Sequence, residues 1–179
     1  MGDTPKAPDV NAVDRTWWLD GPVGVYHKFC WEFGQAYDAL NDQQDLTPAA
    51  YHAMNACITA WSLVDWICAD MDEHDAWATV VNTAGAKDAE QFRKKALSCR
   101  ELVACQQIAN AAKHRSLGRG YQPGYSVHDE LTPCDTDGRL TYIRAMSVRL
   151  HGGQFDIRIL LHEVFKWWER VLVELRYFP

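Results

Sequence analysis

A regular repeat of apolar side chains constrains the fold of this chain more than any other feature. Between positions 50 and 71, apolar residues recur at alternating spacings of four and three: Ala50, Met54, Cys57, Trp61, Val64, Cys68 and Met71. This spacing keeps the side chains on one side of an α-helix, where they pack against neighbouring helices. Thr47 followed by Pro48 fits the start of that helix, with the threonine as N-cap. The repeat therefore predicts a long helix of a helical bundle.

Two further segments carry helical apolar patterns. Between Val23 and Leu40, five residues share one helical face: Tyr26, Phe29, Phe33, Tyr37 and Leu40. Asp156 fits an N-cap, and the repeat after it comprises Ile157, Leu161, Val164, Trp168, Val171 and Leu175. Each pattern predicts one amphipathic helix.

A third long helix is predicted from about Asp88 to Lys113. On a helical wheel, one face holds Phe92, Ala96, Cys99 and Val103, and a second holds Leu97, Ala104 and Ile108. A helix that is apolar on two faces touches two neighbours, so we expect it at the centre of the bundle.

The region between the third and last helices has a different character. Leu117–Asp137 is rich in glycine, proline and polar residues and is predicted to be a long excursion. Leu140–Leu150 looks extended, and a turn at 151–153 follows it, which predicts a β-hairpin. The expected fold is mainly α, a four-helix bundle with a small β-hairpin insertion before the last helix. We expect a single domain over residues 14–179 and a disordered tail over 1–13.

Composition and charge narrow the function classes. A formal net charge of −6 opposes bulk attraction to nucleic acid, so such binding needs a local basic patch. The chain lacks an apolar run near the roughly 18 residues of a membrane span, and the first 13 residues lack the apolar core of a secretory signal. Most of the six cysteines stand at apolar helical positions without a Cys-x-x-Cys pair, so we expect buried free thiols and a cytoplasmic protein.

Two polar side chains stand at the end of the predicted third helix. Asn110 and His114 are four residues apart, so they are neighbours on the helix surface. A histidine at a helix C-terminus is favoured in its protonated form, which suits acid–base chemistry. The cations Lys113, Arg115 and Arg119 suit an anionic ligand. The structural alternative is that His114 caps the last carbonyls and Asn110 satisfies loop backbone.

The helix order and this motif resemble the HEPN superfamily. Residues 102–114, Leu-x-x-Cys-x-x-Ile-Ala-Asn-Ala-Ala-Lys-His, resemble a group of small bacterial and phage-associated helical proteins with an Ala-Asn-x-x-Lys-His motif. Nucleases of this superfamily carry Arg-polar-x-x-x-His at this place, and the motifs of two protomers meet across a dimer. They cleave RNA without a metal, with the 2′-hydroxyl as the internal nucleophile.

The resemblance implies a role for each matching position. Asn110 matches the polar position and His114 the histidine, so these two are the implied catalytic residues. Ala109 occupies the arginine position, and alanine neither binds phosphate nor stabilises a phosphorane. Arg100 lies 14 residues before His114, about 21 Å along a helix. Arg119, in a loop flanked by glycines, is the better substitute for the arginine.

Two functions are compatible with these residues. The first is a HEPN-like protein directed at RNA, which binds it or cleaves it as a metal-independent endoribonuclease, in a defence or toxin–antitoxin system. The second is a catalytically inactive HEPN-like interaction module, or an inhibitor of a protein partner. Ala109 and the net acidity favour the second, whereas Asn110, His114 and their basic neighbours favour the first. In both cases we expect a homodimer without a cofactor, a bound metal or membrane contact.

Two other groups of residues have alternative interpretations. The acidic stretch Asp70–Asp75 matches no known cation-binding loop and is expected to be a solvated helix end. Asp65 adjoins the apolar repeat, so we expect it to be partly buried and to pair with Arg100 or orient His114. In each of the doublets 17–18 and 167–168, one tryptophan is expected to face outward or into a partner.

Overall fold

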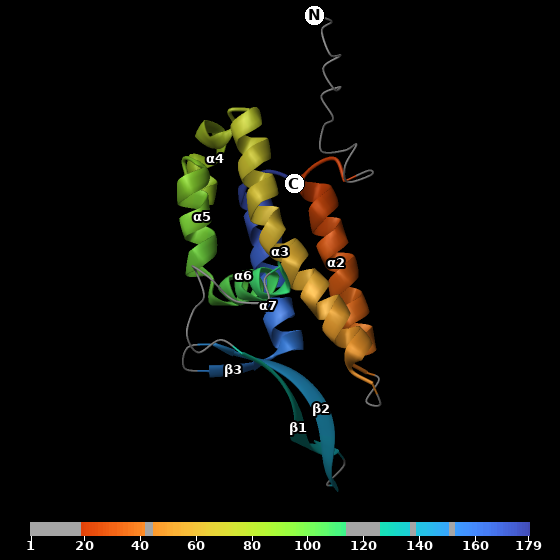
Figure 1. Cartoon of the computed structure of the whole chain (residues 1–179). Helices are drawn as coiled ribbons and strands as arrows, with labels where there is room; N and C mark the ends of the chain where they lie inside the picture. The colour runs from red at the N-terminus through yellow and green to blue at the C-terminus, as the bar shows by residue number, and fades with distance from the viewer. Residues whose placement is uncertain (1–18, 42–44, 114–125, 137–138, 151–152) are drawn as a thin grey trace, which may run out of the picture.

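The computed structural model describes residues 19–41, 45–113, 126–136, 139–150 and 153–179 (Figure 1). Its elements, in chain order, are α2 (Pro22–Ala39), α3 (Thr47–Glu73), α4 (Trp77–Ala84), α5 (Ala89–Ser98), α6 (Arg100–Lys113), β1 (Ser126–Thr136), β2 (Arg139–Leu150), β3 (Gly153–Asp156) and α7 (Ile157–Glu174). The described chain is therefore mainly helical, with a small antiparallel sheet before the last helix. The predicted tail, 1–13, lies outside the described residues.

α3 is the long helix that the apolar repeat predicts. Four members of the repeat are buried, Cys57, Val64, Cys68 and Met71, and the other three are partly buried against the same core. The predicted cap at its start is wrong. The helix begins at Thr47 itself, and the backbone N–H of Thr47 donates to Oδ1 of Asp45 at 2.8 Å. The carboxylate of Asp45 therefore accepts a backbone hydrogen bond at the start of the helix, where the sequence predicts the Thr47 hydroxyl as the acceptor.

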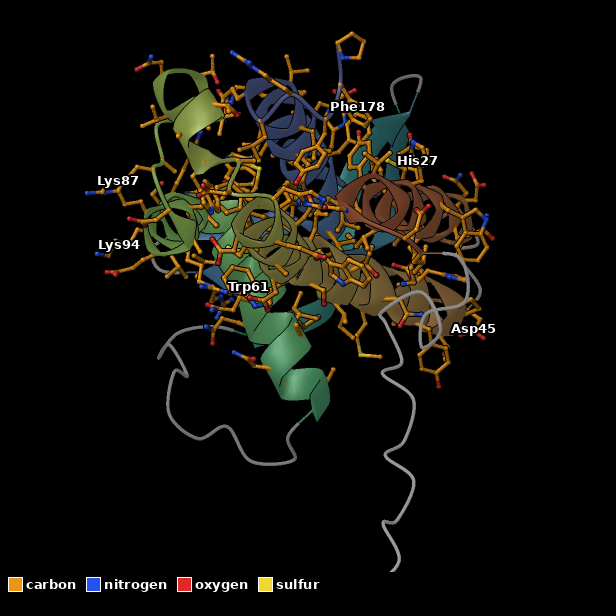
Figure 2. All side chains as sticks on the ribbon, turned by 90° about the horizontal axis from the view of Figure 1, so that it is seen from above. His27, Asp45, Trp61, Lys87, Lys94 and Phe178 are labelled. Atoms are coloured by element: carbon orange, nitrogen blue, oxygen red, sulfur yellow. The ribbon has the colours of Figure 1, made fainter. Side chains whose placement is uncertain are left out.

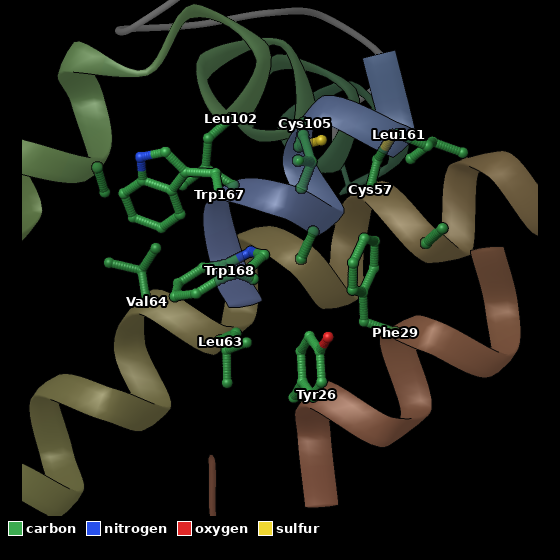
Figure 3. Close-up of a cluster of buried hydrophobic side chains, with 14 of the residues drawn as sticks. Tyr26, Phe29, Cys57, Leu63, Val64, Leu102, Cys105, Leu161, Trp167 and Trp168 are labelled. Carbon is green, nitrogen blue, oxygen red and sulfur yellow. The ribbon is translucent and has the colours of Figure 1, made fainter. Parts of the chain in front are cut away.

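One hydrophobic core joins the helices. Every residue of the predicted α7 repeat is buried, and Asp156 caps α7 by accepting from the N–H of Arg158 at 2.7 Å. In Figure 3, side chains from α2 and α3 surround Trp168: Tyr26, Phe29, Leu63 and Val64. The expectation that one ring of the 167–168 doublet faces outward is wrong, because both tryptophans are buried. Their rings meet edge-to-face, with centroids 4.6 Å apart. The doublet 17–18 lies outside the described residues.

The third predicted helix is wrong as a single helix. The chain breaks at Cys99, whose backbone is extended (φ −86°, ψ 109°), so that α5 and α6 are separate helices. Seen from above, α5 is viewed nearly along its axis and α3 obliquely, whereas α6 lies across the view (Figure 2). Phe92 lies on α5 and Val103 on α6, so they do not share one face of a single helix. The central position is confirmed for α6, which contacts α3, α5 and α7.

The described strands form one antiparallel sheet in the order β1-β2-β3. β1 begins at Ser126, so the predicted excursion over Leu117–Asp137 is wrong for its second part. The extended segment Leu140–Leu150 is confirmed as most of β2, and it pairs with both neighbours. Four consecutive β2 residues, Ala145, Met146, Ser147 and Val148, are buried where the sheet meets the helices. The sheet therefore closes one end of the helical part (Figure 1).

Candidate functional site

The candidate motif lies in the last turns of α6. Every residue from Leu102 to Ala109 is buried except Gln106, Asn110 is partly exposed, and the two alanines after it are exposed. Asn110 is the one predicted site residue whose side chain the structure describes. The side chain of Lys113 and the whole of His114, Arg115 and Arg119 lie outside the described residues. The proximity of Asn110 and His114 therefore stays a prediction.

Ala109 is part of the interior of the protein. It is 1% exposed, although Gln106 and Asn110 on the neighbouring turns of α6 are partly exposed. An arginine side chain at this position has to displace packed neighbours or carry its charge into an apolar region, and both are costly. The position that the HEPN resemblance equates with the catalytic arginine therefore faces the core.

Arg100 and Asp65 do not belong to the motif. Arg100 begins α6, where its guanidinium pairs with Glu101 at 3.0 Å and lies 4.1 Å from the ring centre of Phe155. The side chain of Asp65 is 68% exposed and pairs with Arg93 at 3.4 Å. The predicted partial burial of Asp65 and its pairing with Arg100 are therefore wrong. Asp65 points to solvent because it stands on the outer side of α3.

The acidic end of α3 is used for structural hydrogen bonds. Asp72 accepts from Nε1 of Trp77 at 2.6 Å, and Asp70 accepts from the hydroxyl of Tyr177. A hydrogen bond to the backbone carbonyl of Asp70 raises the pKa of His74. The described residues contain no group of three or more side chains able to hold a metal ion. None of the described helices has both the length and the apolar character needed to cross a membrane.

The described cysteines are free thiols, and four of them lie in surroundings that disfavour the thiolate. Burial raises the pKa of Cys68 to about 11 and also raises the pKa values of Cys30 and Cys99. A hydrogen bond with Cys57, together with burial, raises the pKa of Cys105 well above its usual range. Because the thiolate is the nucleophile, the raised pKa values leave Cys30, Cys68, Cys99 and Cys105 unactivated at neutral pH.

One charged group is buried between α2 and α3. Glu32 is 4% exposed and pairs with Lys28, and its Oε2 accepts from the hydroxyl of Thr59 at 2.6 Å. Nζ of Lys28 also lies 2.6 Å from Oγ1 of Thr59. Because the buried carboxylate has an ionic and a hydrogen-bonding partner, we assign these residues to the α2–α3 contact.

An apolar cavity of about 340 Å³ lies where the end of α6 meets α3, the sheet and the start of α7. Its lining comprises Ala50, Ala53, Met54, Ile108, Ala111, Ala112, Val127, Met146, Ser147, Val148 and Ile157. Sequence reasoning missed this cavity. The available signal is the concentration of alanine on α3 and α6, because small side chains leave space where helices and strands meet.

Aromatic side chains also lie exposed on α2 and α3. Trp31 and Tyr51 are each 61% exposed, and the ring of Trp31 meets that of His52 edge-on with centroids 6.3 Å apart. We call the contacting pair Trp31 and His52 the aromatic face. The sequence singled out the tryptophan doublets as candidates for an exposed ring, whereas among the tryptophans that the structure describes Trp31 is the exposed one.

Comparison of the chain with known families, curated proteins and solved structures finds no match.

Proposed function

We propose that this protein is an interaction module that binds a protein partner and does not cleave RNA. The aromatic face is the observation that carries the proposal. Trp31 and Tyr51 are among the residue types most enriched at the energetic centres of protein interfaces. At 61% exposure, Trp31 and Tyr51 forgo the burial that most of the other described aromatic residues obtain at least in part. Contact with a partner provides that burial.

The partner that we infer is a second copy of this chain. In a two-fold symmetric dimer the same patch meets itself, so it has to be self-complementary. A patch of aromatic rings satisfies this condition, because offset and edge-on ring contacts form equally well between identical surfaces. This inference agrees with the homodimer expected from the sequence.

The burial of Ala109 supports the absence of RNA cleavage. A metal-free nuclease of the HEPN type uses an arginine at this position, and here the position faces the core. Arg100 cannot replace it, because Arg100 is held by Glu101 and Phe155 at the opposite end of α6. The distance along α6 from Arg100 to Lys113 is about 20 Å.

The fold and location belong to the same proposal. We infer a HEPN-like four-helix bundle formed by α2, α3, α7 and the α5–α6 pair, which share one core. The free thiols support a reducing compartment and so a cytoplasmic location.

RNA binding is the second candidate function. Asn110 is partly exposed on the last full turn of α6, and Lys113, His114 and Arg115 follow it in the sequence. These groups would contact phosphate at the end of the helix. The net charge of −6 restricts such binding to a local patch.

Sedimentation velocity tests the homodimer. We expect the wild type to form a dimer at micromolar concentration and Trp31→Ala to raise the dissociation constant at least tenfold. Tyr37→Ala is the matched control, since Tyr37 is 51% exposed on α2 and lies six residues beyond Trp31, about 240° round the helix. A wild type that stays monomeric, or equal effects of the two substitutions, contradicts the inferred partner.

An assay with mixed RNA in EDTA separates the two functions. We expect no cleavage by the wild type or by His114→Ala, and binding of RNA no stronger than that of a non-specific acidic protein. Cleavage by the wild type that is lost in His114→Ala would overturn the proposal and establish a metal-independent ribonuclease.

A further inference from the structure

We propose that the cavity at the end of α6 binds a small, uncharged, mainly apolar molecule. This inference goes beyond the interaction module and does not depend on it. It rests on three properties of the cavity, which are its walls, its size and the chemistry of its lining.

The walls come from four different parts of the fold. α3 contributes alanines and Met54, α6 contributes Ile108 with the two exposed alanines, the sheet contributes β1 and β2 residues, and Ile157 begins α7. A groove for a partner helix runs along one or two helices and offers anchor sites at helical spacing. Enclosure by helices and strands together instead favours a compact ligand.

The size fits a small molecule. Ligand sites in proteins range from roughly 300 to 1,000 Å³, and this cavity holds about 340 Å³. An enclosed apolar cavity of roughly 150 Å³ already binds benzene. The cavity here is larger and reaches the surface, where Ala111, Ala112 and Val127 are exposed. A molecule with one or two rings, or a short alkyl chain, is therefore of suitable size.

The described part of the lining carries no charge. Among the residues that the structure describes, those lining the cavity are apolar except Ser147, which is 2% exposed. Its Oγ accepts from Nε2 of Gln154 at 3.0 Å, which uses one of the acceptor positions of the hydroxyl. A charged ligand would lose its hydration without gaining an ionic partner. Because side chains alternate along a strand, the hydroxyl of Ser147 lies on the opposite face of β2 from Met146 and Val148.

Two methionines make the site adaptable. Met54 on α3 and Met146 on β2 both line the cavity. Unbranched thioether side chains adjust to ligands of different shape more readily than branched ones do. The cavity is therefore suited to a class of apolar molecules.

The cavity is separate from Asn110, the motif residue whose side chain the structure describes. Asn110 is two residues from Ile108 and two from Ala112, which places it about 200° round the helix from each of them. Ile108 and Ala112 line the cavity, so Asn110 lies on the opposite side of α6. A ligand in the cavity is therefore not a substrate held at Asn110.

Isothermal titration calorimetry with n-octanol tests the proposal on the full chain. We expect saturable binding with one site per chain, and octanoate binding at least tenfold more weakly because of its charge. Absence of saturable binding, or equal binding of the alcohol and the carboxylate, would overturn the proposal.

Ala111→Phe places a ring at the cavity wall and should weaken octanol binding at least tenfold. Ala111 is exposed, so the helix tolerates the change, and unchanged far-ultraviolet circular dichroism verifies this. Ala69→Phe, at an exposed site of α3 that lies 16 residues beyond Ala53, is the matched control and should bind as the wild type does. Ala112→Phe is a second variant at the wall. Wild-type affinity in both wall variants contradicts the location.

Discussion

The two ends of the helical part are built from different contacts. At one end, α4, α5 and the last turns of α3 and α7 are joined by polar contacts, and we call this the packed end. Nζ of Lys95 donates to Oε2 of Glu174 at 2.6 Å and to the carbonyl of Ala84 at 2.7 Å. The hydroxyl of Thr83 donates to the carbonyl of Glu174 at 2.6 Å. These bonds link the ends of α4, α5 and α7 to one another.

The opposite end, which we call the cavity end, consists of the start of α3, the end of α6 and the sheet. The described residues that line its cavity are apolar apart from Ser147, and alanines leave about 340 Å³ between them. At the packed end, Trp77 and Phe92 fill the corresponding space, with ring centroids 5.8 Å apart. The comparison indicates that the packed end stabilises the fold, whereas the cavity end keeps room for a ligand.

The largest effect is expected at the packed end, for Trp77→Ala. Trp77 is 6% exposed and donates to Asp72, so the substitution leaves a large cavity and breaks a hydrogen bond. We expect the free energy of unfolding to fall by about 3–5 kcal/mol in urea denaturation. Tyr37→Ala, at a site that is 51% exposed, should cost less than about 1 kcal/mol. Similar losses of unfolding free energy for the two variants would contradict a stabilising role of the packed end.

Two identical substitutions on one face of α3 compare the cavity with the filled core. Ala53 lines the cavity, and Ala60 lies seven residues further on the same face but does not line it. Leucine at 60 overpacks the core and should destabilise the protein by about 1–3 kcal/mol. Leucine at 53 fills space and should stabilise it by about 0.5–2 kcal/mol. If leucine at 53 and leucine at 60 destabilise the protein equally, there is no unfilled space beside Ala53.

Alkaline pH should weaken the packed end through Cys68. Its pKa is raised from 9.0 to about 11 in the folded protein, so the unfolded chain loses the proton first. The contribution of this thiol to stability is complete below pH 9 and falls as the pH rises towards 11. Between pH 8 and 10.5 we expect a loss of about 2 kcal/mol that is missing in Cys68→Ala. If the unfolding free energies of the wild type and Cys68→Ala fall in parallel with pH, the raised pKa of Cys68 is contradicted.

The smallest effect is expected for Asp65→Asn. The pair with Arg93 is exposed and 3.4 Å long, so its removal should change the free energy of unfolding by less than about 0.5 kcal/mol. A loss above about 2 kcal/mol in thermal unfolding would mean that Asp65 has the buried role predicted from the sequence.

The sequence predicts those elements whose pattern lies within one straight segment. The α7 repeat and the Asp156 cap are local signals, and both are confirmed. The break at Cys99 has no glycine or proline to mark it. The residue after it, Arg100, is held by Phe155, which is far away in the sequence. Such long-range contacts override helix propensity, and a single continuous wheel cannot show them.

In the candidate site, too, local features are predictable from the sequence and long-range packing is not. Asn110 is partly exposed, as a polar residue near a helix end should be, but the burial of Ala109 depends on neighbours from other helices. The cavity is likewise formed by alanines that are distant in sequence, and the aromatic face depends on which side α2 presents to α3. The sequence shows the residue types, whereas the packing of the elements decides which of them are covered.

The methyl NMR signals of three methionines in xenon-saturated buffer test the difference between the two ends most directly. Met54 and Met146 line the cavity, whereas Met71 is 3% exposed near the end of α3 at the packed end. Xenon enters apolar cavities without forming hydrogen bonds. We expect the methyl signals of Met54 and Met146 to shift with xenon pressure and that of Met71 to stay in place. Equal shifts of all three, or a shift of Met71 alone, would contradict an accessible apolar cavity at the end of α6.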